Sequence, residues 1–300
     1  MIMQTQIKAK PQDNRRGLSV FFCHGEKEDL PVLEVLGTRG SMDTTEPTPL
    51  SCCIIAQNEG DRIGDCIRAV QGLVSELVVI DSGSTDDTVA VAEALGARVI
   101  HHDWPGYGPQ KRYSEDCATH DWILNLDADE VVTPALFSEI KALMASRPRR
   151  NAYRFRIKNV YPGKAKPRLW ADYHNYVRLY DRRVVRFRES LVHDTVDTKA
   201  EPVGQLQGAV MHFSARSYAH IRAKLDSYTN LQAKVLKKPA WAIWLRLPFE
   251  YPFVFIRYFF FRAHFTGGWD GLYSSHLAAE ARLNRLRKIL SAQKTAKAAN

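Results

Sequence analysis

The sequence is poor in the features that mark zinc-binding, disulfide-linked or membrane-spanning chains. Its five cysteines are odd in number and form no Cys-x-x-Cys pair, which argues against a zinc site and favours buried thiols in a reducing compartment. Uncharged apolar runs stay short of the roughly 18–20 residues that span a bilayer. No apolar segment follows Met1, so a signal peptide is not expected. These absences predict a cytoplasmic protein.

Positive charge is unevenly distributed along the chain. The formal net charge is +9, yet residues 216–300 contain 15 Lys and Arg against 4 Asp and Glu, a local balance of +11. The rest of the chain is therefore slightly acidic. A basic segment can attract nucleic acid, anionic lipid or an acidic substrate. Within it, residues 240–265 interleave aromatic rings with arginines, which suits either a second hydrophobic cluster or a segment at a membrane interface.

Hydrophobic periodicity predicts a regular alternation of strands and helices in the first half of the chain. Strands are predicted at 50–56, 77–80, 98–101 and 122–126, and helices at 62–74, 85–95, 113–119 and 134–144. This order argues for a parallel sheet with right-handed crossovers. Ser84 and Thr85 are expected to cap the second helix, and Thr133 with Pro134 to begin the fourth.

The pattern changes after residue 151, where the predicted strands become shorter and less regular. Strands are predicted at 153–157, 177–180, 185–187 and 208–212, and helices at 218–236 and 277–290. This second half therefore predicts a mixed sheet followed by helices rather than a continuation of the parallel pattern. The last ten residues are polar.

Three carboxylates, Asp127, Asp129 and Glu130, follow the predicted strand at 122–126. Uncompensated carboxylates repel one another and are costly at the end of a buried strand. A divalent cation would remove both costs. Hard oxygen ligands suit Mg²⁺ or Mn²⁺, which usually share their coordination with substrate phosphates. Because ligands bind at the carboxyl ends of parallel strands, we predict a metal–diphosphate site at this edge.

Polar residues also follow the first two predicted strands. Asn58 and Glu59 end the first strand, and Asp81 ends the second, ahead of a Ser-Gly-Ser-Thr turn. Helix capping alone would explain each of them. Asp81 is not needed as a cap if Ser84 or Thr85 serves. Three strands that end in polar residues at one edge favour a shared ligand pocket.

In this order and spacing, the motifs resemble those of family 2 of the inverting glycosyltransferases. The resemblance is carried by residues 56–59 (Ala-Gln-Asn-Glu), 79–86 (Val-Ile-Asp-Ser-Gly-Ser-Thr-Asp) and 127–129 (Asp-Ala-Asp). It is closest to bacterial lipopolysaccharide core enzymes that add a β-linked glucose to inner-core heptose. Residues shared with that subgroup lie at 102–111, 191–194, 212–214 and 267–272.

The resemblance implies the GT-A fold, an α/β nucleotide-diphospho-sugar transferase fold. Its Rossmann-like sheet is mainly parallel, with a mixed second half and, here, a helical C-terminal segment. We therefore expect three parts: a weakly ordered extension at 1–47, a GT-A catalytic domain at 48–236, and a basic, aromatic helical segment at 237–300. The lipid-linked acceptor of the resembled enzymes favours a membrane-interfacial role for the last part.

Met42 lies just ahead of the first clear strand. One hypothesis is that translation starts at Met42 and that residues 1–41 do not belong to the native protein. The intact mass of the protein isolated from its native host tests this hypothesis. A mass that includes residues 1–41 would refute it.

Carried over residue by residue, the resemblance implies roles at the donor site. Asn58, Glu59 and Asp81 would line the nucleoside pocket, and Asp127 would approach the ribose. Lys111, in a Gln-Lys element, could contact phosphate or remain a solvated lysine.

The resemblance also implies a metal site for Mg²⁺ or Mn²⁺. Asp129 would bind the metal on the diphosphate, with Asp127 beside it. His212 resembles a late histidine that completes the metal shell in some GT-A enzymes, although a lone histidine is more often structural. Arg178, Arg182 and Arg183 suit either an acceptor phosphate or a solvated turn.

An inverting transfer requires a base that deprotonates the acceptor hydroxyl on the face of the sugar opposite the leaving group. Asp194 is the base candidate by resemblance, although the similar subgroup more often has Glu in this His-acid pair. A salt bridge with a nearby arginine is the alternative role for Asp194. Asp172 is the competing candidate, and His193 would orient Asp194 or pack in the core.

The sequence therefore predicts a metal-dependent inverting glycosyltransferase that moves a hexose, glucose by resemblance, from UDP-glucose to a lipopolysaccharide inner-core acceptor. It would act as a peripheral protein at the inner face of the inner membrane and bind no nucleic acid. Capsule, exopolysaccharide or another lipid-linked glycan is the alternative acceptor. A nucleotidyltransferase would need a Gly-rich basic loop that residues 57–62 do not supply. A non-catalytic membrane-surface or nucleotide-binding protein would leave Asp81, Asp127 and Asp129 unexplained.

Overall fold

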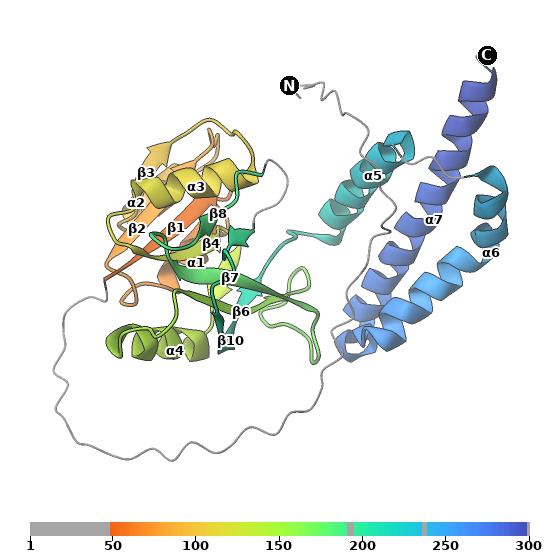
Figure 1. Cartoon of the computed structure of the whole chain (residues 1–300). Helices are drawn as coiled ribbons and strands as arrows, with labels where there is room; N and C mark the ends of the chain where they lie inside the picture. Colours follow the sequence, from red (N-terminus) through yellow and green to blue (C-terminus); the bar gives the residue numbers. More distant parts are fainter. Residues whose placement is uncertain (1–48, 191–194, 236–238, 299–300) are drawn as a thin grey trace. The chain divides into compact units, whose positions relative to one another are not determined.

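The structure is a computed structural model, and it describes residues 49–190, 195–235 and 239–298 (Figure 1). The expected extension at 1–47 lies outside these residues. His193 and the base candidate Asp194 lie outside them as well. The described part of the chain forms a large sheet with covering helices, followed by a group of long C-terminal helices.

The large sheet has eight strands in the order β3-β2-β1-β4-β7-β6-β10-β5. Its strands are β1 (Leu50–Ala56), β2 (Glu76–Asp81), β3 (Arg98–His101), β4 (Trp122–Asp127), β5 (Glu130–Val132), β6 (Ala152–Asn159), β7 (Tyr173–Asp181) and β10 (Val203–His212). Neighbours among β1 to β4 are parallel, whereas β7 runs antiparallel to both β4 and β6. The predicted α/β fold, with a parallel first half and a mixed second half, is confirmed. A separate pair, β8 (Arg186–Phe187) and β9 (Val196–Asp197), is antiparallel.

The central strand β1 is apolar apart from Ser51, because helices cover both faces of the sheet. All of its residues are buried. Cys52 and Ile54 pack in one cluster with α1 (Ile63–Arg68), α2 (Thr88–Ala94) and α4 (Pro134–Ala145), and Cys53 and Ile55 pack in a second cluster with the end of α3 (Tyr107–Cys117). Alternate side chains of one strand thus belong to two cores, and the cysteines serve as small apolar residues.

The start of α2 differs from the sequence prediction. The helix begins at Thr88, and Ser84 and Thr85 are not its caps. Instead, the Ser84 hydroxyl accepts a hydrogen bond from the backbone N–H of Asn58 at 2.9 Å, and the Thr85 N–H donates to the Asn58 side chain at 2.8 Å. Contact with the loop after β1 therefore overrides local capping.

The other helices agree with the prediction to different degrees. The Thr133 hydroxyl caps α4 by accepting from the Leu136 N–H at 3.4 Å, as expected. Helix α3 begins at Tyr107 rather than at 113, because Pro109 in its first turn is compatible with a helix start. Helix α1 ends at Arg68, and the chain then turns through Gly72, which has a φ of 77°.

The C-terminal part is helical. It contains α5 (Tyr218–Val235), α6 (Ala240–Ile256) and α7 (Gly268–Ala298), with a π-helical turn at Arg257–Phe261 and a 3₁₀ turn at His264–Gly267 between α6 and α7. Helix α7 contacts both α5 and α6. Ile243 of α6 packs against Leu286, Ile289 and Leu290 of α7 in a small core. Among the described helices, none is long and apolar enough to cross a membrane.

Glu76 ties together the edge of the sheet where the parallel strands begin. Its carboxylate accepts hydrogen bonds from the Ser51 hydroxyl of β1, from the Arg98 guanidinium of β3 at 2.8 Å and from the Thr119 N–H at 2.7 Å. Partial burial opposes ionisation, but these donors outweigh it and lower the pKa of Glu76 to about 2.

Replacing Glu76 by Gln should change the pH dependence of folding. Since the folded pKa is depressed, the stabilisation is present above the ordinary pKa of 4.5 and is lost as pH falls from 4.5 towards 2. With allowance for solvent screening, Glu76→Gln should lower the free energy of unfolding by on the order of 1–2 kcal/mol at neutral pH. It should also flatten the acid limb in urea denaturation series at stepped pH.

Asp65→Asn is the matched control, because the Asp65 side chain is exposed and its ion pair with Arg68 lies at the surface. It should leave the stability nearly unchanged. An acid limb as steep in Glu76→Gln as in the wild type would contradict the assigned role of Glu76.

Candidate active site

The sheet register brings the three polar strand ends to one edge. In the pairing of β1 with β2, Asp81 lies opposite Ala56, and in the pairing of β1 with β4, Asp127 lies opposite Ile55. The loop that starts at Gln57 therefore leaves the sheet between Asp81 and Asp127. The prediction that these strand ends share one edge is confirmed.

Asn58 joins the loop after β1 to the loop after β2. It has a φ of 56°, and its side-chain oxygen accepts hydrogen bonds from the N–H of Thr85 at 2.8 Å and from the Thr85 hydroxyl at 3.3 Å. The next residue, Glu59, donates its N–H to the Thr88 hydroxyl at 2.8 Å. Asn58 thus holds the two loops together, and its side-chain oxygen is engaged within the protein.

Asp81 organises the turn that follows β2. Its carboxylate accepts from the backbone N–H groups of Gly83 and Ser84, each at 3.0 Å, and from the Ser84 hydroxyl. Asp81 is therefore not the cap of α2, but the expected reason is wrong, because Ser84 is bonded to Asp81 and Asn58 rather than capping that helix. The His101 ring lies 4.0 Å from the same carboxylate.

Asp127 is held between two buried cations. Lys111 of α3 lies 2.8 Å from one carboxylate oxygen, and Arg178 of β7 lies 3.1 Å from the other. Lys111 is fully buried, so the solvated-lysine interpretation is wrong. Burial opposes ionisation of Asp127, but Lys111 and Arg178 outweigh it and hold its pKa well below the ordinary value. Asp127 therefore remains a carboxylate inside the sheet edge.

Asp129 points to a different set of partners. Its carboxylate lies 3.3 Å from Nε2 of His212 and 3.4 Å from the Arg62 guanidinium. The other ring nitrogen of His212 lies 3.1 Å from the Asn159 side-chain oxygen. Burial lowers the pKa of His212, but the hydrogen bond and negative charge of Asp129 outweigh burial and raise it. The structure thus brings Asp129 and His212 together, as the sequence predicted.

Glu130 completes the acidic turn from within the protein. It is buried, and its carboxylate accepts the backbone N–H of Asp127 at 3.1 Å. Burial raises the pKa of Glu130 to about 7, and the charge of Asp127 adds to this rise while Arg178 opposes it. Glu130 therefore serves to shape the Asp127–Asp129 turn.

Two arginines near the site were not identified as site residues from the sequence. Arg62 donates to the Glu59 carboxylate at 2.7 Å and to the Phe213 carbonyl at 2.8 Å. Arg216 reaches the Asn58 carbonyl at 2.6 Å and the Glu59 carboxylate at 3.2 Å. The contact of Arg62 with Glu59 could have been predicted from their spacing of three residues. Arg216 is 157 residues from Glu59, so the sequence gave no indication of that contact.

The donor set fits a divalent cation in part. Among the described residues, no group of three or more His, Cys, Asp or Glu side chains is arranged to hold a metal ion. Asp129 and His212 offer one hard oxygen and one imidazole nitrogen, whereas both oxygens of Asp127 are occupied by Lys111 and Arg178. Such a pair suits Mg²⁺ or Mn²⁺ only if substrate phosphates and water supply the remaining ligands.

Of the two candidates for the catalytic base, the structure describes the contacts of Asp172 only. Asp194 lies outside the described residues. Asp172 lies 3.1 Å from Arg168 and 3.1 Å from Nε2 of His264. Burial opposes ionisation of Asp172, but the hydrogen bond from His264 and the charges of Arg262 and Arg168 lower its pKa. A carboxylate with a lowered pKa is a weaker base, so this geometry favours a positioning role for Asp172.

Two of the three arginines considered for an acceptor phosphate are engaged within the protein. Arg178 is buried against Asp127 and Asn125. Arg182 donates to the carbonyls of Glu115 and Ala118. Neither is a solvated charge on a turn. Arg183 is exposed and pairs with Asp181 and Asp121, so it alone retains that interpretation.

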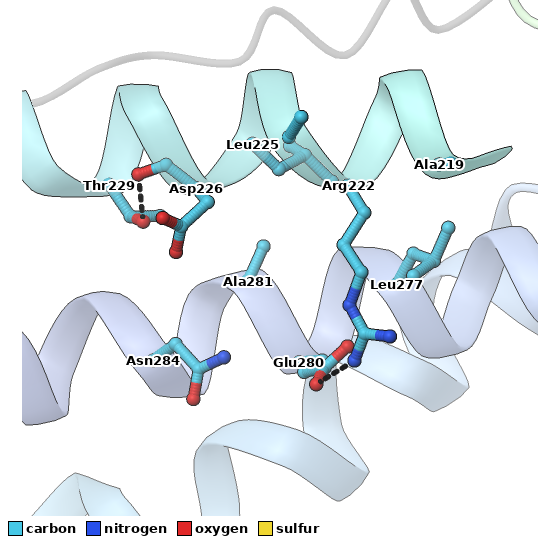
Figure 2. Close-up of a pocket in the computed structure, with 10 residues that line it drawn as sticks. Ala219, Arg222, Leu225, Asp226, Thr229, Leu277, Glu280, Ala281 and Asn284 are labelled. Carbon is cyan, nitrogen blue, oxygen red and sulfur yellow. Dashed lines mark hydrogen bonds and ion pairs between the residues drawn. The ribbon is translucent and has the colours of Figure 1, made fainter. Parts of the chain in front are cut away.

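Of two hollows in the described surface, the smaller lies at the site and the larger lies elsewhere. One of about 230 Å³ lies beside Asp129 and is lined by Arg62, Phe213 and Arg216. A larger one, about 400 Å³, lies between α5 and α7, where Arg222 and Glu280 form an ion pair at 2.6 Å (Figure 2). Its lining comes from these two helices, so the larger hollow is not the site of the strand-end carboxylates.

Comparison with known proteins gives consistent matches. Residues 51–199 match the family model described as glycosyl transferase family 2. A Rickettsia felis protein described as an uncharacterized glycosyltransferase is 38% identical over 251 residues, covering 80% of this chain and 89% of that protein. The lipopolysaccharide core biosynthesis glycosyltransferase LpsC of Rhizobium meliloti is 27% identical over 233 residues, covering 74% and 85%.

Solved structures show a weaker likeness. The crystal structure of residues 1–349 of S. aureus TarS is 14% identical and covers 61% of this chain and 64% of that chain, with a TM-score of 0.42. Because this score is low, the family relationship depends on the sequence matches and on the motifs at the strand ends.

Removing the buried lysine should destabilise the whole domain. Lys111→Met keeps the length of the side chain but leaves Asp127 with Arg178 as its remaining cationic neighbour. Breaking a buried ion pair from one side costs about 3–5 kcal/mol. We expect a loss of this size in the free energy of unfolding, measured by urea denaturation. Lys141→Met, at an exposed position of α4, is the control and should change it little. Equal stabilities of the two variants would refute the ion-pair assignment.

Proposed function

The chain belongs to glycosyl transferase family 2, and we propose that it transfers a hexose from a nucleotide-sugar to a lipid-linked acceptor by a metal-assisted, inverting reaction. The observation that carries this proposal is the pairing of Asp129 with His212 at the sheet edge that Asp81 and Asp127 share. A carboxylate and an imidazole beside a hollow suit a cation that is completed by diphosphate.

The donor would lie across the ends of β1, β2 and β4. We assign the nucleoside side to the loops after β1 and β2, which the hydrogen bonds of Asn58, Glu59 and Asp81 to Ser84 and Thr88 hold together. Asp127 would face the ribose. Because Lys111 and Arg178 hold it from within the protein, its orientation is set before the donor binds.

The metal would be held by Asp129 and His212. Mg²⁺ or Mn²⁺ supplies Lewis-acid neutralisation of the leaving diphosphate. The nearby Arg62 places a further positive charge beside Asp129, at 3.4 Å. Asp194 would accept the proton of the acceptor hydroxyl as the base, so that attack occurs from the opposite face and inverts the sugar carbon. Asp172 is the alternative base.

The acceptor proposed is the lipopolysaccharide inner core, with glucose from UDP-glucose as the transferred sugar. The similarity to LpsC, a lipopolysaccharide core biosynthesis glycosyltransferase, supports this choice over capsule or exopolysaccharide. The enzyme would act as a peripheral protein at the inner face of the inner membrane. A non-catalytic nucleotide-binding role is the second candidate, since the donor site alone would support it.

Donor binding should depend on Asp129. At 100 times its dissociation constant, a donor adds about 2.7 kcal/mol of stability, which corresponds to a rise of several degrees in melting temperature. We expect UDP-glucose with Mn²⁺ to give such a rise in the wild type and not in Asp129→Asn. Asp226→Asn on α5, an exposed carboxylate, should behave as the wild type. A panel of nucleotide-sugars that gives no shift in any of the three proteins would contradict the proposed function.

Catalysis should depend on Asp194 more than on Asp172. Loss of a general base lowers turnover by about 10²–10⁴-fold. We expect Asp194→Asn to lose activity in this range, in an assay of glucose transfer to truncated core oligosaccharide, while it keeps the donor-induced melting shift. Asp197→Asn, three residues further along the chain, is the control. A larger loss in Asp172→Asn than in Asp194→Asn would exchange the two assignments.

A further inference from the structure

Helix α6 carries an apolar stripe that no other described element covers. Its members recur every three or four residues, the spacing of one helix face. They are Trp241, Trp244, Leu245, Phe249 and Phe253, with exposures between 57% and 72%. Exposed apolar patches of this extent are rare on monomeric proteins and mark surfaces for a partner or a membrane.

The stripe faces away from the rest of the protein. The opposite side of α6 is buried through Ile243, Glu250 and Val254, and Ile243 packs against Leu286 and Ile289 of α7. A surface helix normally presents polar residues to water on the side that faces away from the protein. In α6 that outward side is the apolar stripe. Folding of this chain alone therefore does not account for the exposed aromatic residues of α6.

The apolar surface continues past the end of α6. Phe260, Phe261 and Phe265 are exposed in the two short turns, and Trp269 at the start of α7 is 83% exposed. Trp170, from the loop before β7, contacts Phe265 edge to face at 6.4 Å between ring centroids. We call the five stripe residues together with Phe260, Phe261, Phe265 and Trp269 the aromatic face.

The positive charge of the segment that carries the aromatic face indicates which kind of partner covers it. Glu250 is the sole acidic residue of the segment 240–267, and it is buried and paired with Arg246 at 2.7 Å. Arg257 and Arg262 border the face, within a C-terminal segment of net charge +11. In a two-fold symmetric dimer through this face, two copies of the same positively charged segment would meet. An anionic lipid surface offers the complementary charge and takes aromatic rings at its headgroup level.

We propose that the aromatic face lies in the headgroup region of an anionic bilayer, with α6 parallel to the membrane plane. Aromatic side chains on one side of a helix and arginines at its border are the composition of an interfacial helix. The inference extends the proposed function, because it identifies the surface through which the enzyme would reach a lipid-linked acceptor. It can fail independently, since binding to vesicles is measured without donor or acceptor.

The aromatic face is tied directly to the candidate acceptor side of the site. Arg168 donates to the carbonyls of Arg262 at 2.8 Å and Ala263 at 3.1 Å, and it also binds the Asp172 carboxylate. His264 of the same turn contacts Asp172 at 3.1 Å. A bilayer that holds the aromatic face would therefore also fix the position of the loop that carries Asp172.

Vesicle cosedimentation of the full chain tests the proposal. Vesicles of phosphatidylethanolamine with phosphatidylglycerol are compared with vesicles of phosphatidylcholine. Each buried Phe contributes on the order of tenfold to partitioning, so the double variant Phe249→Ser with Phe253→Ser should bind the anionic vesicles roughly 100-fold more weakly. The double variant Trp241→Ser with Trp244→Ser should also bind the anionic vesicles more weakly than the wild type does. Wild-type binding should fall as salt is raised, because anionic headgroups contribute.

The matched control is Tyr228→Ser with Leu231→Ser, which removes two exposed apolar side chains from α5 and should leave binding unchanged. Circular dichroism checks that the variants fold, as expected for exposed positions. Asp129→Asn should bind vesicles as the wild type does, which separates this proposal from the donor site. Failure of the wild type to bind, or equal binding by the Phe249/Phe253 variant, would overturn the proposal. So would a wild-type dimer, seen by light scattering, that this variant converts to a monomer.

Discussion

The ion-paired Asp127 is the constraint on which the arrangement of the site depends. It ends β4, the strand that joins the parallel half of the sheet to the mixed half. A carboxylate there requires neutralisation, and the two cations come from opposite directions in the chain: Lys111 from α3, which precedes β4, and Arg178 from β7, which follows it. One charged group therefore fixes α3 and β7 relative to the same strand end. These ion pairs matter more for positioning α3 and β7 than for the net stability of the fold, because desolvation offsets much of their Coulomb energy.

The surrounding polar groups follow the same logic. Asp81 and Glu130 accept backbone N–H groups within their own turns, and Asn58 accepts one from the loop after β2, so side-chain acceptors hold the turns at the sheet edge in place. This leaves Asp129, with His212, as the carboxylate that opens toward the hollow. The carboxylates at this edge thus divide into those that hold turns and one that faces the hollow.

The C-terminal helices add a second surface with its own physical character. Their small core of aliphatic residues between α6 and α7 holds the pair together, while the aromatic residues remain outside it. The contacts of Arg168 and His264 with Asp172 join this surface to the sheet. Donor chemistry at the strand ends and access to an amphiphilic acceptor can thus be supplied by different parts of one chain.

The sequence by itself determined the four parallel strands of the first half and the positions of their polar ends. β1, whose seven residues are all buried, and β3, an edge strand that is partly exposed, were both predicted to the residue. The clustering of Asp81 and Asp127 followed from strand order alone. Tertiary structure decided what each carboxylate binds, because the partners are distant in sequence: Arg178 is 51 residues from Asp127, and Arg62 is 67 residues from Asp129. It also decided that Ser84 and Thr85 bond to a neighbouring loop rather than cap a helix, since local propensity is weaker than a hydrogen bond supplied by a packed neighbour.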